Sequence, residues 1–95
     1  MLIVRGVNIY PSAIDNMIRG IPDVVEYEVE IRRVRGLDDL LIKVEIGNAQ
    51  AFQAIRVALL ERFRAELNIR ANIEVAASGS LPRYEFKASR YKRIT

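Results

Sequence analysis

The segment that decides the fold runs from Val25 to Ile46 and reads VEYEVEIRRVRGLDDLLIKVEI. Apolar side chains alternate with polar ones along most of both halves. The alternating apolar residues are Val25, Tyr27, Val29, Ile31, Leu40, Ile42, Val44 and Ile46. A period of two residues is typical of a β-strand that buries one face. We therefore predict an antiparallel pair of strands joined by a hairpin connection over residues 35–39. The other side of the two strands, which we expect to face solvent, carries Glu26, Glu28, Glu30, Lys43 and Glu45.

A helix is predicted on each side of this strand pair. The first covers residues 12–21, with Ser12 as its N-cap. The second covers residues 49–67, between a capping Asn48 and an Asn68 that suits the left-handed C-terminal position. Each helix has an apolar stripe at a spacing of three or four residues, which indicates a buried side. The two stripes consist of Ile14, Met17, Ile18, Ile21, Phe52, Ile55, Leu59, Phe63 and Leu67.

Two further strands complete the expected fold. One is a short strand over residues 1–4 and the other covers residues 71–75, where apolar residues alternate again. The order β-α-β-β-α-β predicts an α+β fold with both helices on one face of a mainly antiparallel sheet, as in ferredoxin-like and ACT-like domains. We expect residues 1–95 to form a single domain, with residues 81–95 as an extended basic tail.

The composition excludes several classes of chemistry. The chain has 95 residues, of which 51% are hydrophobic and 28% charged, as in a folded domain. It contains no cysteine and no histidine, so disulfides, thiolate catalysis, Cys/His zinc sites and histidine acid–base catalysis are excluded, and we expect no metal site. No apolar run is long enough for a signal peptide or a membrane span, so we expect a cytoplasmic location and no membrane partner.

Basic residues are concentrated at the C-terminal end of the chain. The net charge is only +3, yet the residues from position 83 onward include a single acidic side chain, Glu85. The basic residues there are Arg83, Lys87, Arg90, Lys92 and Arg93. Such a terminus suits contact with an anion, for example a nucleotide phosphate or a nucleic acid, and it also suits a solvated tail.

Two segments have no obvious packing role. In the first, Arg5-Gly6-Val7-Asn8-Ile9-Tyr10-Pro11, a glycine precedes a proline that opens a helix, so the turn can approach a ligand closely. In the second, Leu81-Pro82-Arg83-Tyr84-Glu85-Phe86-Lys87-Ala88-Ser89-Arg90, a proline-stiffened arm presents Lys87 and Arg90 beyond the last core strand. Taken singly, each segment also fits a plain turn or a solvated tail.

Taken together, the two segments resemble the C-terminal lid domain of the phenylacetate-CoA ligase family of adenylate-forming acyl-CoA ligases. The first is similar to the family pattern D-D-M-L-I-x-R-G-V-N-V-F-P-S-x-I-E, which residues 1–15 match from the methionine onward. The second, from Gly79 to Arg90, is similar to G-x-L-P-R-S-E-G-K-A-x-R. The resemblance extends over residues 1–93. Two departures stand out in the second segment: Phe86 replaces a glycine, and Tyr84 replaces a small hydroxyl residue.

The resemblance implies an activity that is shared with a large N-terminal adenylation domain. Members join an aryl carboxylic acid, phenylacetate by default, to CoA through an acyl-adenylate, with ATP and Mg²⁺ bound mainly by the large domain and AMP released. By this resemblance Lys87 is the catalytic lysine of adenylation, and the loop Arg5-Gly6-Val7-Asn8 enters the site for thioester formation. Arg83 and Arg90 would contact nucleotide phosphate. The domain alone would be inactive, and its exposed partner surface would permit a homodimer.

Two other readings remain open on the residues alone. A free-standing ACT-like or ferredoxin-like regulatory or ligand-binding domain has the same predicted topology. An RNA-binding module would use the basic tail, but the exposed strand positions are rich in glutamate and lack the stacking aromatic residues of RNA-recognition sheets, so we expect no nucleic-acid partner. The acid substrate cannot be read from this sequence, because the family's acid pocket lies on the large domain.

Overall fold

The computed structural model describes residues 2–83 and 91–94 of the chain. Its elements are β1 (Leu2–Val4), β2 (Val7–Ile9), α1 (Pro11–Arg19), β3 (Val24–Val34), β4 (Leu37–Ile46), η1 (Ala49–Ala51), α2 (Phe52–Arg62), η2 (Phe63–Leu67), β5 (Ala71–Ala76) and β6 (Tyr91–Ile94). Because η1 and η2 are a 3-10 and a π turn that adjoin α2, the helical path is continuous over residues 49–67, as predicted.

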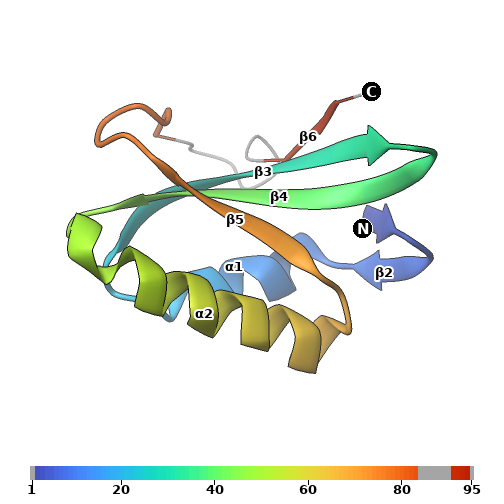
Figure 1. Ribbon diagram of the computed structural model, residues 1–95, viewed down its shortest axis with the longest axis horizontal. Helices are drawn as coiled ribbons and strands as arrows, with labels where there is room; N and C mark the ends of the chain where they lie inside the picture. The colour runs from blue at the N-terminus through green and yellow to red at the C-terminus, as the bar shows by residue number, and fades with distance from the viewer. Residues whose placement is uncertain (1, 84–90, 95) are drawn as a thin grey trace.

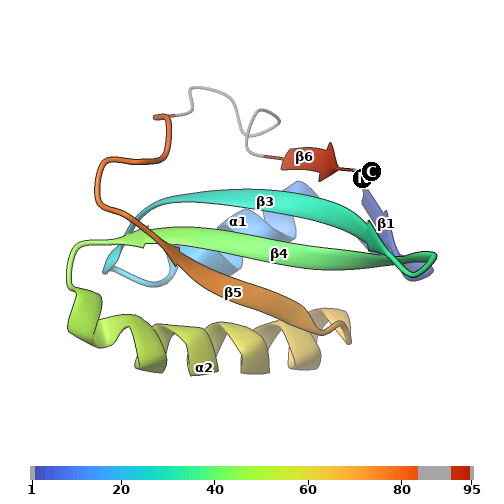
Figure 2. The same ribbon diagram turned by 45° about the horizontal axis from the view of Figure 1, so that its top comes forward.

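Both helices pack on one face of a four-stranded sheet with the order β5-β4-β3-β6 (Figures 1 and 2). The predicted α+β class is therefore confirmed. The long β3–β4 hairpin forms the centre of the sheet, with Val29 opposite Ile42 and Tyr27 opposite Val44. No helix within the described residues is long and apolar enough to cross a membrane.

The sheet is mixed, whereas we predicted a mainly antiparallel one. The central pair β3–β4 is antiparallel, but β5 is parallel to β4 and β6 is parallel to β3. The parallel arrangement of β5 follows from its connection: a crossover through α2 returns the chain to the same end of the sheet. Strand β6 lies within the predicted basic tail, and its pairing with β3 places the last described residues at the edge of the sheet.

The N-terminal strand pairs with a strand that the sequence did not indicate. Strands β1 and β2 form a separate two-stranded sheet, so the order begins β-β-α and not β-α. The reason is the turn between them, where Arg5 and Gly6 have φ angles of 51° and 78°. Positive φ at both central residues is the pattern of a type I′ hairpin turn, which reverses the chain in two residues. Residues Val7–Ile9, which we placed in the turn before the first helix, therefore form strand β2.

Helix α1 begins one residue earlier than predicted and has a different cap. Pro11 is its first residue and Tyr10 is the N-cap, with no side-chain capping bond, so Ser12 is not the cap. Proline suits the first helical position because its fixed φ is helical and its missing N–H has no partner there. The second helix confirms both predicted ends: the Asn48 side chain accepts a bond from the backbone N–H of Gln50, and Asn68 adopts the left-handed conformation.

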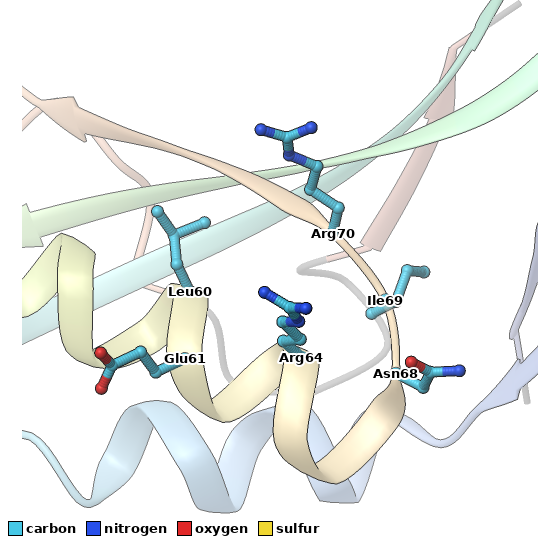
Figure 3. Close-up of a pocket in the computed structure, with 6 residues that line it drawn as sticks. All are labelled: Leu60, Glu61, Arg64, Asn68, Ile69 and Arg70. Atoms are coloured by element: carbon cyan, nitrogen blue, oxygen red, sulfur yellow. The ribbon is translucent and has the colours of Figure 1, made fainter.

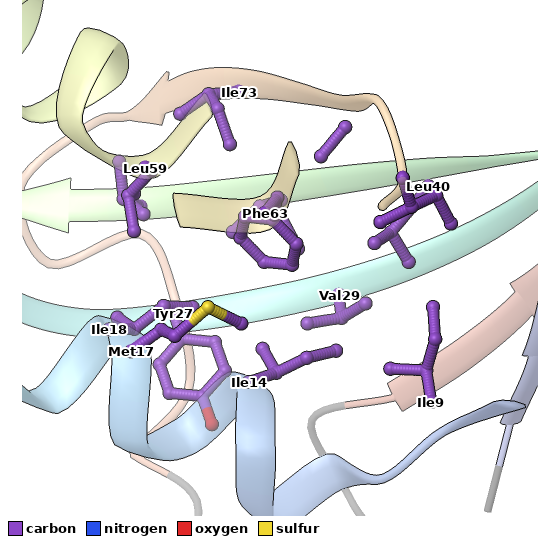
Figure 4. Packing of buried hydrophobic residues seen from close by; sticks show 14 of the residues in the cluster. Ile9, Ile14, Met17, Ile18, Tyr27, Val29, Leu40, Leu59, Phe63 and Ile73 are labelled. Carbon is purple, nitrogen blue, oxygen red and sulfur yellow. The ribbon is translucent and has the colours of Figure 1, made fainter. Parts of the chain in front are cut away.

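The hydrophobic core lies between the helices and the sheet (Figure 4). The largest fully buried side chains include Tyr27, Phe63, Ile14, Leu59 and Ile42, all of which belong to the predicted stripes and strand faces. Val25 is an exception, because it is 48% exposed although the alternation predicted it inside. A β-bulge between Val24 and Glu26 shifts the register there and turns its side chain outward.

The glutamates that we expected in solvent are buried. Glu26, Glu28 and Glu30 are each 5% exposed and Glu45 is 2% exposed. Buried carboxylates require partners: Glu28, Glu30 and Glu45 form ion pairs, and Glu26 accepts a hydrogen bond from the backbone N–H of Tyr27. The carboxylate of Glu30 contacts Lys43 at 2.8 Å and Arg32 at 2.6 Å, which lowers the pKa of the Glu30 carboxyl, mainly through Lys43. Glu28 contacts Lys92, a residue of β6, at 3.2 Å.

Candidate functional site

The first candidate segment is the turn between β1 and β2. Nothing lies within 4 Å of the position that a Cβ on Gly6 would occupy, so the space above the turn is open. Arg5 ties the turn to the start of β4: its Nε donates to the carbonyl oxygen of Asp38 at 2.9 Å, and its terminal nitrogen contacts the carboxylate of Asp39 at 2.6 Å. Val7 packs against the core, while Asn8 is exposed. Of the four predicted loop residues, Arg5 and Gly6 thus form the tethered, open turn, and Val7 and Asn8 begin strand β2.

A second turn of the same kind lies at the same end of the molecule. Arg35 and Gly36 join β3 to β4 with φ angles of 53° and 80°, and a Cβ on Gly36 would also meet nothing within 4 Å. Figure 1 shows both turns at one end of the long axis. The two Arg-Gly turns share sequence, backbone angles and open surroundings. Gly36 is therefore a matched control for any substitution at Gly6.

Two surface hollows border the first turn and the end of α2. One, of about 600 Å³, is lined by Arg5, Val7, Asp39, Asn68, Ile69, Arg70 and Asn72. The other, of about 620 Å³, shares three of these residues and is lined by Leu60, Glu61, Arg64, Asn68, Ile69 and Arg70 (Figure 3). Within the described part of the chain, none of the ion pairs involves Arg64, Arg70 or Glu61, so two arginines and one glutamate around the second hollow keep their charges without an ionic partner.

The second candidate segment begins at Arg83, which the structure holds against the sheet. The Arg83 guanidinium donates to both oxygens of the Glu45 carboxylate, at 2.9 and 2.7 Å. The backbone N–H of Leu81 donates to the same carboxylate at 3.4 Å. A bidentate guanidinium–carboxylate pair is among the strongest hydrogen-bonded arrangements in proteins. Lys87 and Arg90, the other predicted residues of this segment, lie outside the described residues.

The two candidate segments are far apart. Arg5 contacts Asp39 near the start of β4, whereas Arg83 contacts Glu45 near its end. Asp39 and Glu45 are six positions apart along the strand, which places their Cα atoms about 20 Å apart. In Figure 1 the turn at Gly6 and the segment after β5 lie at opposite ends of the sheet. The predicted loop residues therefore lie close to one another but far from Arg83.

Sequence reasoning missed Glu45. We placed it on a solvent-facing side of β4, where an acidic residue needs no explanation. Two signals could have identified it: the acidic side of the strand pair and an arginine-bearing segment that must return over the sheet after β5. The ion pair lowers the pKa of the Glu45 carboxyl from the ordinary value of 4.5 to about 2, mainly through the bond from Arg83.

This pKa shift predicts a pH-dependent stability. Because the folded-state pKa is depressed, the ion pair stabilises the fold above pH 4.5, and this contribution is lost as the pH falls from 4.5 towards 2. We expect the urea midpoint of Glu45→Gln to lie below that of the unmodified chain near neutral pH, and the two midpoints to converge in acid. Glu74→Gln, which changes an exposed glutamate on β5, is the control and should show no such convergence. A midpoint difference that is constant across this pH range would show that Glu45 acts through packing and not through its charge.

Comparison with known proteins places these features in context. The model of the AMP-binding enzyme C-terminal domain family matches residues 6–92. The phenylacetate-coenzyme A ligase of Escherichia coli strain K12 is 33% identical over 97 residues, which cover 95% of this chain and 22% of that protein. The chain therefore spans only about a fifth of the length of this curated relative.

Solved structures have the same fold. A domain of phenylacetate-coenzyme A ligase from Bacteroides vulgatus has a TM-score of 0.84 at 21% identity, and the match covers 99% of this chain and 92% of that one. The structure of 2-hydroxyisobutyryl-CoA ligase in complex with 2-HIB-AMP and CoA, in the thioesterification state, has a TM-score of 0.83 at 32% identity. That match covers 98% of this chain and 21% of the ligase.

Proposed function

Since this chain belongs to the AMP-binding enzyme C-terminal domain family, we propose that it is the mobile lid of a cytoplasmic, ATP-dependent, AMP-forming CoA ligase for aryl acids of the phenylacetate type. The proposal includes a large N-terminal adenylation domain as its partner within the same polypeptide. It assigns Lys87 to acyl-adenylate formation and the turn at Gly6 to thioester formation.

The reaction has two steps with different demands. In the first, a carboxylate oxygen of the acid attacks the α-phosphorus of ATP, and pyrophosphate leaves. In the second, the CoA thiol, after loss of its proton, attacks the acyl carbonyl carbon, and AMP leaves. The described residues include no cluster of three or more acidic side chains that could hold a metal ion. The family resemblance assigns Mg²⁺, with ATP, mainly to the large domain.

The separation of the two candidate segments is the observation that carries the proposal. The turn at Gly6 and the described start of the second segment, at Arg83, contact β4 near its opposite ends, about 20 Å apart. A rigid domain cannot present both ends to one reaction centre at once. If both segments serve the same centre, the domain must turn between the two steps, and each orientation then brings a different end into the site.

Each segment suits its proposed step. A cation at Lys87 would stabilise the negative charge that develops on the α-phosphate during transfer. The turn at Gly6 has open space above it, is tethered by Arg5, and has Val7 and Asn8 beside it, so it could border a narrow channel for the thiol arm of CoA. Arg83 is engaged by Glu45, which favours a structural role for it. A phosphate contact by Arg90 stays a prediction.

The proposal predicts that this chain folds alone but makes no acyl-CoA. Its core is complete within the described residues, whereas an acid pocket and an ATP site would lie on the large domain. In the test, the purified chain is incubated with ATP, Mg²⁺, CoA and phenylacetate, and the thioester is assayed. The complete ligase and the ligase without this domain are assayed in parallel. We expect thioester from the complete ligase alone. Thioester formation by the isolated chain would overturn the assignment as a lid.

A further inference from the structure

Asp39 fastens the turn between β1 and β2 to the start of β4. Its carboxylate accepts a hydrogen bond from a terminal nitrogen of Arg5 at 2.6 Å, and the Nε of Arg5 donates to the backbone carbonyl oxygen of Asp38 at 2.9 Å. We call Arg5 with these two acceptors the Arg5 bridge. A planar guanidinium that is bound at two points is restrained in direction as well as in distance.

The β1–β2 hairpin has few other attachments near its turn. Each strand has three residues, and the pair forms a sheet of its own, separate from the four-stranded sheet. A two-stranded hairpin alone is at best marginally stable in water. Val4, Val7 and Ile9 pack against the core and hold the strands, whereas Arg5 and Gly6 are exposed. The exposed turn is therefore held in place by the Arg5 bridge.

The second Arg-Gly turn shows that a turn of this kind forms without a bridge. Arg35 and Gly36 have φ angles of 53° and 80°, nearly those of Arg5 and Gly6. Among the described residues, however, no side-chain hydrogen bond or ion pair involves Arg35. The type I′ geometry therefore does not depend on a fastened arginine. It follows that the Arg5 bridge fixes where the first turn lies, and not how its backbone is folded.

We propose that Asp39 is a positioning residue for thioester formation: through Arg5 it holds the turn at Gly6 in the place where the turn can border the thiol arm of CoA. The inference rests on the proposed function, because it takes this turn as the segment that serves the thioester step. Asp39 itself touches no substrate. A turn that is already in place reacts faster than one that must become ordered each time the thiol arm arrives.

Asp38 offers a matched control, because it is the neighbouring residue and its carboxylate has other partners. That carboxylate lies 3.3 Å from Arg93 on β6 and 3.9 Å from Arg33 on β3. The Asp38 side chain is 14% exposed and that of Asp39 33% exposed, so removal of the Asp38 carboxylate should disturb the fold at least as much. Asp38→Ala nevertheless keeps the backbone carbonyl that accepts from Arg5.

The test is Asp39→Ala in the complete ligase, with the two half-reactions measured separately. Thioester formation from pre-made acyl-adenylate should fall by about 5–10-fold, the effect of losing one charged hydrogen bond at a partly exposed site. Adenylation, measured by ATP–pyrophosphate exchange, should stay within about twofold of the unmodified ligase, as should both half-reactions of Asp38→Ala. Thioester formation unchanged in Asp39→Ala, an equal loss in both of its half-reactions, or the same loss in Asp38→Ala would overturn the proposal.

Companion variants test whether Asp39 acts through Arg5. Arg5→Gln, which removes both contacts of the bridge, should lower thioester formation at least as much as Asp39→Ala, and adding Asp39→Ala to it should lower the rate no further. A further loss in the double variant would contradict action through Arg5. Asp39→Glu, which keeps the charge, should recover part of the rate.

Hydrogen exchange in the complete ligase measures the position of the turn without reference to catalysis. Exchange at residues 2–9 should be faster in Asp39→Ala than in the unmodified ligase, with the amides of β3 and β4 unchanged. Asp38→Ala should leave exchange at residues 2–9 as it is. Unchanged exchange at these residues in Asp39→Ala would show that the bridge does not hold the hairpin, which contradicts the proposal.

Gly6→Leu distinguishes failure of this inference from failure of the proposed function. If Gly6→Leu leaves thioester formation unchanged, the turn does not serve that step, and the proposed function and the inference fail together. If Gly6→Leu slows thioester formation while Asp39→Ala does not, the turn keeps its role, and the inference alone fails because the Arg5 bridge is only structural.

Discussion

Replacing Lys87 with methionine in the complete ligase should slow adenylation by about 10²–10³, the usual cost of removing one preorganised charge from a transition state. Methionine keeps the length of the side chain and removes the ammonium group. Thioester formation from pre-made acyl-adenylate should change little, because we assign that step to the turn at Gly6. ATP–pyrophosphate exchange measures the first step, and CoA-dependent consumption of the adenylate measures the second.

The same substitution at Lys92 is the control. Lys92 belongs to the same basic terminus but pairs with Glu28 on the sheet, so its loss should affect stability more than the rate of adenylation. Adenylation by Lys87→Met within about threefold of the unmodified ligase would exclude the catalytic role, since one preorganised charge contributes more than this. In that case Phe86 would be the first residue to replace. Where the family has glycine, its side chain restricts the backbone before Lys87, and Phe86→Gly should raise adenylation if that restriction is the cause.

Replacing Gly6 with leucine should have the opposite effect on the two steps. The open space above the turn would be filled, so a channel that it borders in the thioester orientation would be obstructed. We expect thioester formation to fall by about 10²-fold or more, as for a misplaced reacting group, and adenylation to be spared. Measurement of both half-reactions on one enzyme preparation gives the result directly.

The backbone at Gly6 requires a careful control. Its φ of 78° strains any residue with a side chain, at a cost of roughly 1–2 kcal/mol. Gly36→Leu imposes the same strain at the second Arg-Gly turn, where φ is 80° and the surroundings are equally open. If Gly36→Leu impairs thioester formation as strongly as Gly6→Leu does, turn strain explains the loss and the channel role is wrong.

The strand pair and the long helix could be predicted because their signals are local and repeated. Alternation along residues 25–46 required two paired strands, and the β3–β4 hairpin has that pairing, although its second face is buried as well. The stripe of the second helix and its end residues, Asn48 and Asn68, lie within a single stretch of chain. Each of these features is decided by neighbours in sequence, so no knowledge of distant contacts was needed.

The features that we missed depend on distant contacts or on backbone angles. The hairpin of β1 and β2 requires positive φ at Arg5, which no pattern of side-chain polarity reveals. The direction of β6 depends on where the chain returns after β5. The burial of Glu45 depends on Arg83, which is 38 residues away in sequence and reaches the sheet only when the fold is complete. Alternation identified the side of the strand that carries Glu45 but not what covers it.

The candidate site was predictable only as two separate motifs. The sequence placed Gly6 in a turn, which is correct, and Arg83 beyond the last core strand, whereas Arg83 lies between β5 and the further sheet strand β6. It could not show that the segments lie near opposite ends of β4, because that relation comes from the packing of the hairpin and β5 against one sheet. The two-orientation proposal follows from this relation and not from either motif alone.

The most direct test of the account is the ratio of adenylation rate to thioester-formation rate in Lys87→Met and Gly6→Leu, measured side by side in the complete ligase. We predict that this ratio falls by about 10²–10³ in Lys87→Met and rises by about 10² or more in Gly6→Leu, since each candidate segment serves a different step. A ratio that moves in the same direction in both variants, or in neither, would contradict the use of the two ends in turn.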